Sequence, residues 1–317
     1  MVQSAPLVVV NHLGEALGSA LSAHPCKPIV ETASTPDRPW AIREDANILI
    51  TGTLPGWRDA PEQAPSELSN LGWIQTISAG VDIFPRWLLS GRLVSTGRGL
   101  TASLVAEYVM AAILRMQKPL ELTAVRGNIW NSTPLGAVAG QRLGIAGFGA
   151  IGAEILQRAR AFEMDVSILR REPPAEAPAG ARYCSDIEEL IGWADHLVLA
   201  LPSTAESRNM LNRSRLLSAR TGLHLINISR GDLLDQEGLI AAIDAGRIRC
   251  ATLDVTDPEP LPIGHPMLTH PKILITPHNA WTGGDWKAAF TARVLRGLDA
   301  YANGDKPDFQ VDVERGY

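Results

Sequence analysis

The most constraining feature of the sequence is a glycine turn between a short apolar segment and an amphipathic one. Arg142–Ala146 leads into Gly147-Phe148-Gly149-Ala150-Ile151-Gly152, and a second apolar segment, Asp165–Leu169, follows the predicted helix. In such a unit the first glycine permits a tight turn, the second admits a pyrophosphate to the helix N-terminus, and the third allows close packing on the strand. The alternative is a glycine-rich turn in an ordinary βαβ unit. The flanking strands favour dinucleotide binding, with five cofactor-binding residues: Gly147, Gly149, Ala150, Ile151 and Gly152.

The end of the next strand carries positive charge where such units usually place a ribose-binding acid. It reads Leu169-Arg170-Arg171. A ribose 2′-hydroxyl favours a carboxylate acceptor, whereas a 2′-phosphate is repelled by a carboxylate and favours cations. Arg170 or Arg171 therefore predicts NADP as the cofactor, with NAD still possible. The alternative is a solvated basic strand end that Glu172 partly neutralises.

Apolar segments alternate with amphipathic ones along the chain, which is typical of α/β folds with parallel sheets. In the first third the predicted strands are Leu7–Val10, Asn47–Thr51, Trp73–Ser78 and Leu93–Ser95. The later ones are Arg142–Ala146, Asp165–Leu169, His196–Ala200, His224–Ile228, Cys250–Leu253 and Ile273–Thr276. Six parallel strands after a glycine turn predict a doubly wound Rossmann domain over residues 98–282. The last amphipathic segment has no strand to follow, so we expect it to return to a substrate domain formed by residues 1–97 and 283–317.

Composition narrows the class of protein. A length of 317 residues suggests two domains, and a net charge of −5 argues against nucleic-acid binding. The three cysteines lack metal-ligand spacing, so we expect no metal site and a reducing compartment. No apolar segment reaches the roughly 20 residues of a membrane span, and no basic region precedes the first apolar run. These features predict a cytoplasmic protein that does not bind membranes.

Three polar residues follow three different predicted strands. Ligands of open α/β sheets bind beyond the carboxyl ends of the strands, and His196 and His224 lie at the other ends. The rule selects His278, Arg230 and the segment "TDPEPLP", which presents Asp257 and, between two prolines, Glu259. A lone histidine or arginine is usually structural, but three such residues at one edge of one sheet indicate a site. A guanidinium can hold a carboxylate, an imidazolium can protonate a carbonyl oxygen as hydride reaches the carbon, and a carboxylate favours the imidazolium. The predicted substrate is a 2-oxo or 2-hydroxy acid beside a nicotinamide.

At this point the chain resembles the D-isomer-specific 2-hydroxyacid dehydrogenases. The resemblance runs through "QTISAGVDIFP", "LVAEYVMAAIL", "GIAGFGAIG", "LALPSTAESRNML", "INISRGDLLDQEGLIAAIDAGRI", "TLDVTDPEPLP" and "ITPHNAW". It implies a flavodoxin-like substrate domain and a homodimer with the helix from Thr101 near the interface. It also implies that Arg230, Glu259 and His278 are catalytic.

The same resemblance implies further site residues. The substrate carboxylate would meet the backbone of Ala79 and Gly80, with Trp281 bordering the substrate. The remaining cofactor contacts would come from Pro202, Ser203, Ile228, Asp254 and His278. Some of these have structural alternatives: Asp254 could cap the turn after its strand, Trp281 could be packing at a domain interface, and Ala79 and Gly80 could form a tight turn that serves the fold alone.

The arginines at the strand end match NADP-using glyoxylate and hydroxypyruvate reductases. The resemblance therefore implies NADP(H)-dependent reduction of a small 2-oxo acid to the D-2-hydroxy acid, with His278 as proton donor. Two alternatives remain open: NAD-dependent oxidation of another 2-hydroxy acid such as phosphoglycerate, and a nucleotide-sensing scaffold without catalysis. A scaffold of this kind is expected to carry partner-binding extensions, whereas about six residues precede the first predicted strand and the C-terminal tail is short.

Overall fold

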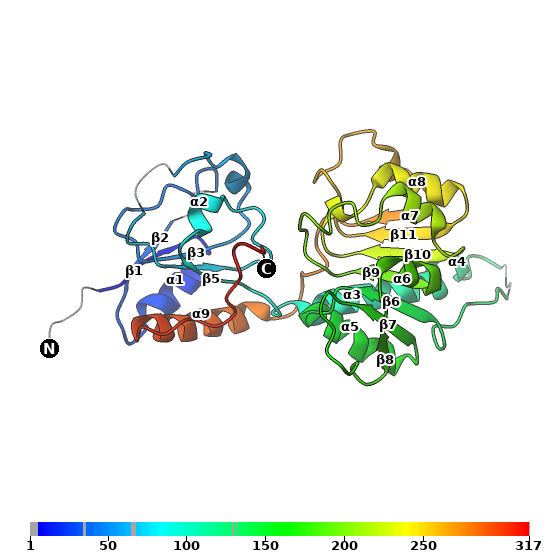
Figure 1. Ribbon diagram of the computed structural model, residues 1–317, viewed down its shortest axis with the longest axis horizontal. Helices are drawn as coiled ribbons and strands as arrows, with labels where there is room; N and C mark the ends of the chain where they lie inside the picture. The colour runs from blue at the N-terminus through cyan, green and yellow to red at the C-terminus, as the bar shows by residue number, and fades with distance from the viewer. Residues whose placement is uncertain (1–5, 34–35, 65–67, 129, 131, 317) are drawn as a thin grey trace. The chain divides into compact units, whose positions relative to one another are not determined.

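The computed structural model describes residues 6–33, 36–64, 68–128, 130 and 132–316. It divides into two compact units, one formed by Met1–Leu100 with Gly284–Tyr317 and the other by Thr101–Gly283 (Figure 1). The second unit is thus inserted in the sequence of the first. Its limits lie at 100/101 and 283/284, close to those predicted from the sequence at 97/98 and 282/283.

The first unit contains a parallel sheet of five strands. They are β1 (Val8–Asn11), β2 (Ile29–Thr32), β3 (Ile48–Thr51), β4 (Trp73–Thr76) and β5 (Leu93–Ser95), in the order β2-β1-β3-β4-β5. This 2-1-3-4-5 order is flavodoxin-like, as the resemblance implies. Strand β2 is missing from the sequence prediction, because its short run "IVET" lies at the sheet edge and only partly buries its side chains.

Helices cover both faces of this first sheet. Alternate residues of β1, β3 and β4 pack on one side against α1 (Glu15–Ser22) and α9 (Trp286–Ala302). The other face packs against α2 (Arg86–Leu89) and the 3₁₀ turn η1 (Pro55–Asp59). The C-terminal helix therefore does return to the N-terminal sheet, as the sequence predicts (Figure 1).

The second unit contains a parallel sheet of seven strands. They are β6 (Arg142–Ala146), β7 (Asp165–Leu169), β8 (Ala181–Tyr183), β9 (His196–Leu199), β10 (Leu223–Asn227), β11 (Ile248–Leu253) and β12 (Ile273–Ile275). Their order, β12-β11-β10-β9-β6-β7-β8, is that of a doubly wound dinucleotide-binding sheet. The predicted six strands omit β8, a three-residue edge strand whose "ARY" carries no apolar run.

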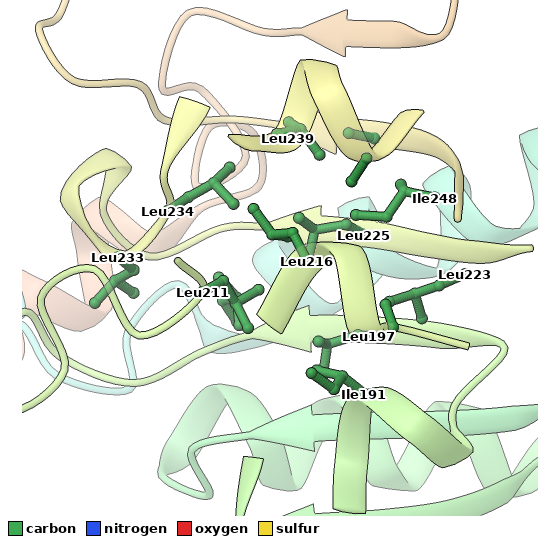
Figure 2. Close-up of a cluster of buried hydrophobic side chains, with 14 of the residues drawn as sticks. Ile191, Leu197, Leu211, Leu216, Leu223, Leu225, Leu233, Leu234, Leu239 and Ile248 are labelled. Carbon is green, nitrogen blue, oxygen red and sulfur yellow. The ribbon is translucent and has the colours of Figure 1, made fainter. Parts of the chain in front are cut away.

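The second sheet is also covered on both faces. Helices α3 (Ala102–Gln117) and α5 (Ala150–Ala161) pack on one face, and α6 (Ile187–Trp193), α7 (Arg213–Ser218) and α8 (Gln236–Asp244) pack on the other. Figure 2 shows leucines of α7 and α8 meeting Leu225 of β10, with Ile191 of α6 beside Leu197 of β9. The shorter α4 (Leu120–Thr123), η2 (Gly231–Leu233) and η3 (Pro266–Leu268) lie in connections. Within the described part of the chain, no helix is both long and apolar enough to cross a bilayer.

Candidate active site

The glycine turn joins β6 to α5, and its backbone requires glycine at two positions. Gly147 has φ 97°, and a Cβ there would lie 2.7 Å from the backbone of Ala200 at the end of β9. A Cβ on Gly152 would lie 2.8 Å from the carbonyl oxygen of Gly147, so this glycine lets the helix pack against the turn. The turn and the neighbouring strand end consequently approach each other backbone to backbone.

The N-terminus of α5 suits an anionic ligand. Its N-cap is Gly149, no side chain caps it, and Ala150 and Ile151 begin the helix. The first N–H groups of a helix have no intrahelical acceptor, and they carry the positive end of the helix dipole. A dinucleotide pyrophosphate fits this arrangement, because it supplies the acceptors and the negative charge.

The arginines at the end of β7 lie on the surface. Arg170 and Arg171 are both exposed. The Arg171 guanidinium lies 2.8 Å from the carboxylate of Glu206, which follows β9. Glu172, the neutralising partner considered from sequence, is exposed as well.

Arg230 follows β10 at its carboxyl end. The buried Asn227 side chain donates to the Arg230 carbonyl oxygen at 2.8 Å and accepts from the Ser229 N–H at 3.1 Å. The Arg230 guanidinium donates to the Ser229 carbonyl oxygen at 2.8 Å. The Asn227 side chain thus fixes the backbone that carries Arg230.

Gly231 brings the Arg230 loop against the loop that carries Glu259. A Cβ on Gly231 would lie 2.0 Å from the carbonyl carbon of Thr256 and 2.4 Å from the Asp257 nitrogen. Both neighbours are backbone atoms, so no side-chain rotation could relieve the clash. Sequence patterns do not single out Gly231, because a close approach of two distant loops leaves no local signal beyond the glycine itself.

Glu259 and His278 form a hydrogen-bonded pair. The Glu259 carboxylate lies 3.1 Å from Nδ1 of His278 and accepts the Thr256 N–H at 3.2 Å with its other oxygen. Since the carboxylate is the acceptor, Nδ1 carries the proton and Nε2 is the nitrogen that remains for chemistry. Partial burial alone would raise the pKa of Glu259. The hydrogen bond and charge of His278, the Thr256 N–H and the charge of Arg230 outweigh it and lower that pKa.

The loop from Thr276 to Ala280 holds His278 in an unusual backbone conformation. His278 has φ 51°, a left-handed value that few residues other than glycine adopt. Its N–H donates to the carbonyl oxygens of Asp254 and Thr276, both at 2.9 Å. These two bonds tie the imidazole-bearing residue to the carboxyl ends of β11 and β12.

Asp254, at the end of β11, is the anchor of this loop. Its carboxylate, on a residue that is only 3% exposed, accepts the N–H groups of Asn279 and Ala280 at 2.9 Å each and the Thr276 hydroxyl at 2.6 Å. Asp254 therefore caps the turn after its strand, which is the structural alternative given for it above. The contact of Asp254 with the cofactor stays a prediction.

Four further predicted residues lie close to this edge of the sheet. The Ser203 hydroxyl donates to the Asp232 carboxylate at 2.6 Å, and the Pro202 carbonyl oxygen accepts the Ser207 hydroxyl at 2.7 Å. The buried Ile228 directly follows β10. The Trp281 indole donates to the His278 carbonyl oxygen at 2.8 Å while its side chain stays exposed.

Ala79 and Gly80 belong to the other unit. They follow β4 in a bend that the Ser78 hydroxyl closes by donating to the Gly80 carbonyl oxygen at 2.8 Å. Their backbone belongs to a turn beyond the carboxyl end of a strand. This is the position at which α/β sheets bind ligands.

Comparisons with known proteins agree on one family. Residues 108–280 match the model described as "D-isomer specific 2-hydroxyacid dehydrogenase, NAD binding domain". A glyoxylate/hydroxypyruvate reductase B of Yersinia pestis (strain Pestoides F) is 37% identical over 225 residues, which cover 66% of this chain and 68% of the relative.

The similarity extends over the whole chain in structure. A D-isomer-specific 2-hydroxyacid dehydrogenase of Xanthobacter autotrophicus Py2, solved in complex with NADPH and MES, is 26% identical with a TM-score of 0.81. The match covers 99% of this chain and 100% of that one. The chain belongs to the D-isomer-specific 2-hydroxyacid dehydrogenases, a family of oxidoreductases that use NAD(P).

Proposed function

We propose that the protein reduces a small 2-oxo acid to the D-2-hydroxy acid with NADPH as the hydride source. The observation that carries this proposal is the Glu259–His278 pair, which lies beyond the strand ends of a dinucleotide-binding sheet within reach of the Arg230 charge. An acid, its orienting carboxylate and a cation are the groups that carbonyl reduction of an anionic substrate requires.

Each residue of the trio has one role in this reaction. The Arg230 guanidinium binds the substrate carboxylate and polarises the adjacent carbonyl oxygen. His278 donates the proton from Nε2 to that oxygen, because Glu259 holds the proton on Nδ1. Glu259 also places a negative charge beside the ring that donates the proton. Trp281 borders the substrate.

The cofactor assignment depends on the two ends of the dinucleotide site. The uncapped start of α5 would hold the pyrophosphate, and Pro202, Ser203, Ile228 and Asp254 lie at the strand ends where the nicotinamide would bind. When bound, the nicotinamide supplies the hydride. Arg170 and Arg171 favour the 2′-phosphate of NADP, and a structural relative was solved with NADPH.

Glyoxylate and hydroxypyruvate are the proposed substrates. The Yersinia relative named for both compounds supports this choice, and so does a site with one guanidinium for one carboxylate. A panel of glyoxylate, hydroxypyruvate, pyruvate and 3-phosphohydroxypyruvate, assayed with NADPH and with NADH, tests it. We expect the highest kcat/KM for one of the first two with NADPH. A preference for the phosphorylated acid, or for NADH, would contradict the proposal.

We also propose a homodimer formed around the segment that follows α3. Large apolar side chains are exposed there, with Leu122 and Trp130 each 85% exposed. Exposed large apolar side chains gathered along one segment favour an interaction site. Light scattering should give twice the chain mass at micromolar concentration, and Leu122→Glu should lower that mass. A wild-type monomer would refute the homodimer.

A further inference from the structure

An ion pair spans the strand that leads into the glycine turn. Arg171 follows β7 and Glu206 follows β9, and these two strands flank β6 in the sheet. The guanidinium and the carboxylate lie 2.8 Å apart. Glu172 is the neutralising acid that the sequence suggests, but the carboxylate that contacts Arg171 comes from a loop 35 residues further along (171 to 206).

The loop that carries Glu206 has fixed internal hydrogen bonds. The Ser207 hydroxyl donates to the Pro202 carbonyl oxygen at 2.7 Å and accepts the Thr204 N–H at 2.8 Å. Ser207 is only 5% exposed. The segment that includes Pro202 and Ser203 therefore holds Glu206 in place, and the carboxylate is part of the same loop as two proposed cofactor contacts.

The position of this carboxylate matters for the choice between the two cofactors. A 2′-phosphate needs the cation that Glu206 contacts, and it would also have to lie near the Glu206 negative charge. A 2′-hydroxyl carries no charge and can donate a hydrogen bond to a carboxylate. The ion pair consequently opposes NADPH and leaves NADH unopposed.

We propose that Glu206 is a specificity-determining residue that reduces the preference for NADPH over NADH by pairing with Arg171. This inference rests on the proposed function. It also gives the two arginines different roles, because Arg171 must break its ion pair with Glu206 when a 2′-phosphate binds. For Arg170, the described chain shows no ion pair, so it can contact the phosphate without such an exchange.

Glu206→Gln tests the proposal through cofactor binding rather than turnover. The arginine side chain is 50% exposed and the glutamate 76%, so solvent screens the pair and the effect is modest. We expect the Kd of NADPH, measured by fluorescence titration at low salt, to fall about three- to five-fold. The Kd of NADH should stay constant or rise. Glu176→Gln is the control, since Glu176 is an exposed carboxylate of the loop after β7 for which the described chain shows no ion pair.

A second background shows whether the effect passes through Arg171. In the Arg171→Gln protein, Glu206→Gln should change the NADPH Kd by less than about two-fold, because the partner is gone. Equal NADPH affinities for the Glu206→Gln and Glu176→Gln proteins would overturn the role of Glu206. Weaker NADPH binding by Glu206→Gln would do the same. A wild-type protein that binds neither cofactor would instead overturn the proposed function.

Discussion

At the scale of single residues, His278 and Glu259 are separable by experiment. His278→Asn removes the proton donor but leaves the dinucleotide contacts at the glycine turn intact. We expect kcat to fall by at least about 100-fold, since a positioned general acid contributes on the order of 10² to 10⁴. The Kd of NADPH, measured by fluorescence titration, should change less than about two-fold. A large loss of NADPH affinity would show that His278 acts mainly in cofactor binding.

Glu259→Gln should slow reduction without abolishing it. The amide keeps the size of the side chain and can still accept the Nδ1–H of His278, but it removes the negative charge beside the ring. A hydrogen bond to a charged group is the stronger kind, so we expect kcat to fall about ten-fold, less than in the His278→Asn protein. Steady-state kinetics with NADPH and glyoxylate measures this loss.

Asp257→Asn provides the matched control for that loss. Asp257 is an exposed carboxylate in the same loop, two residues from Glu259. If the two variants lost the same kcat, the loss would reflect general surface charge. The hydrogen bond at 3.1 Å would then have no part in it.

At the scale of elements, the approach of two loops determines whether Arg230 and Glu259 act together. Gly231→Ala places a methyl group into the Thr256 backbone, so one loop must move. Overpacking of this kind costs about 1–3 kcal/mol of stability. We expect kcat/KM to fall more than about ten-fold, because small displacements of substrate-binding groups have large effects. Steady-state kinetics and the thermal midpoint together check this.

Gly192→Ala is the corresponding control. Gly192 lies in α6, and a Cβ added there would have no atom within 4 Å outside its own helix and chain neighbours, so alanine fits. The kinetics of this variant should match the wild type, with equal or higher thermal stability because alanine favours a helix. A Gly231→Ala protein with wild-type kinetics would show that the two loops can separate without consequence.

The sequence predicts the residues of the site better than the hydrogen bonds that hold them in place. Arg230, Glu259 and His278 could be found because each follows an apolar run, and strand ends of a parallel sheet share one edge. The anchoring bonds from Asp254 to Asn279 and Ala280 could not be found in this way. They join backbone groups 25 and 26 residues away, and no local pattern encodes such a contact.

At the scale of the whole molecule, long buried strands are predictable and short edge strands are not. β9 and β10 are fully buried and mostly apolar, and the sequence predicts both. β2 and β8 pair on one side only, with partly exposed residues, so hydrophobic patterning does not separate them from loops. The doubly wound order still follows from the glycine turn, because right-handed crossovers leave few ways to add strands to β6.

Two buried histidines contact each other near the amino ends of β9 and β10, whereas the proposed site lies at the carboxyl ends of the strands. Nδ1 of His196 in β9 lies 3.1 Å from Nδ1 of His224 in β10. His196 Nε2 contacts the Gln141 side-chain oxygen at 2.9 Å, and His224 Nε2 contacts the Thr252 hydroxyl at 3.0 Å. One neutral tautomer of each ring satisfies every nitrogen, so the network favours uncharged histidines.

This pair makes the stability of the second unit depend on pH. Burial lowers the pKa of His196 to about 4, and burial with the charge of its partner lowers the pKa of His224 to about 3. Both histidines regain a pKa near 6.5 on unfolding, so between about pH 6.5 and 4 the unfolded chain binds more protons. Stability is therefore complete above about pH 6.5 and declines as the pH falls, by about 2 kcal/mol per histidine between pH 7 and pH 5.

Native-state hydrogen exchange at the amides of β9 and β10 measures this loss within the second unit. The opening free energy should fall by about 4 kcal/mol from pH 7 to pH 5 if both histidines stay neutral in the folded state. In a His196→Leu/His224→Leu protein the same difference should shrink by that amount, whatever the absolute stability, because neither leucine titrates. An unchanged pH dependence in the double variant would mean that other groups carry it, and that the folded state accommodates a charged imidazole between β9 and β10.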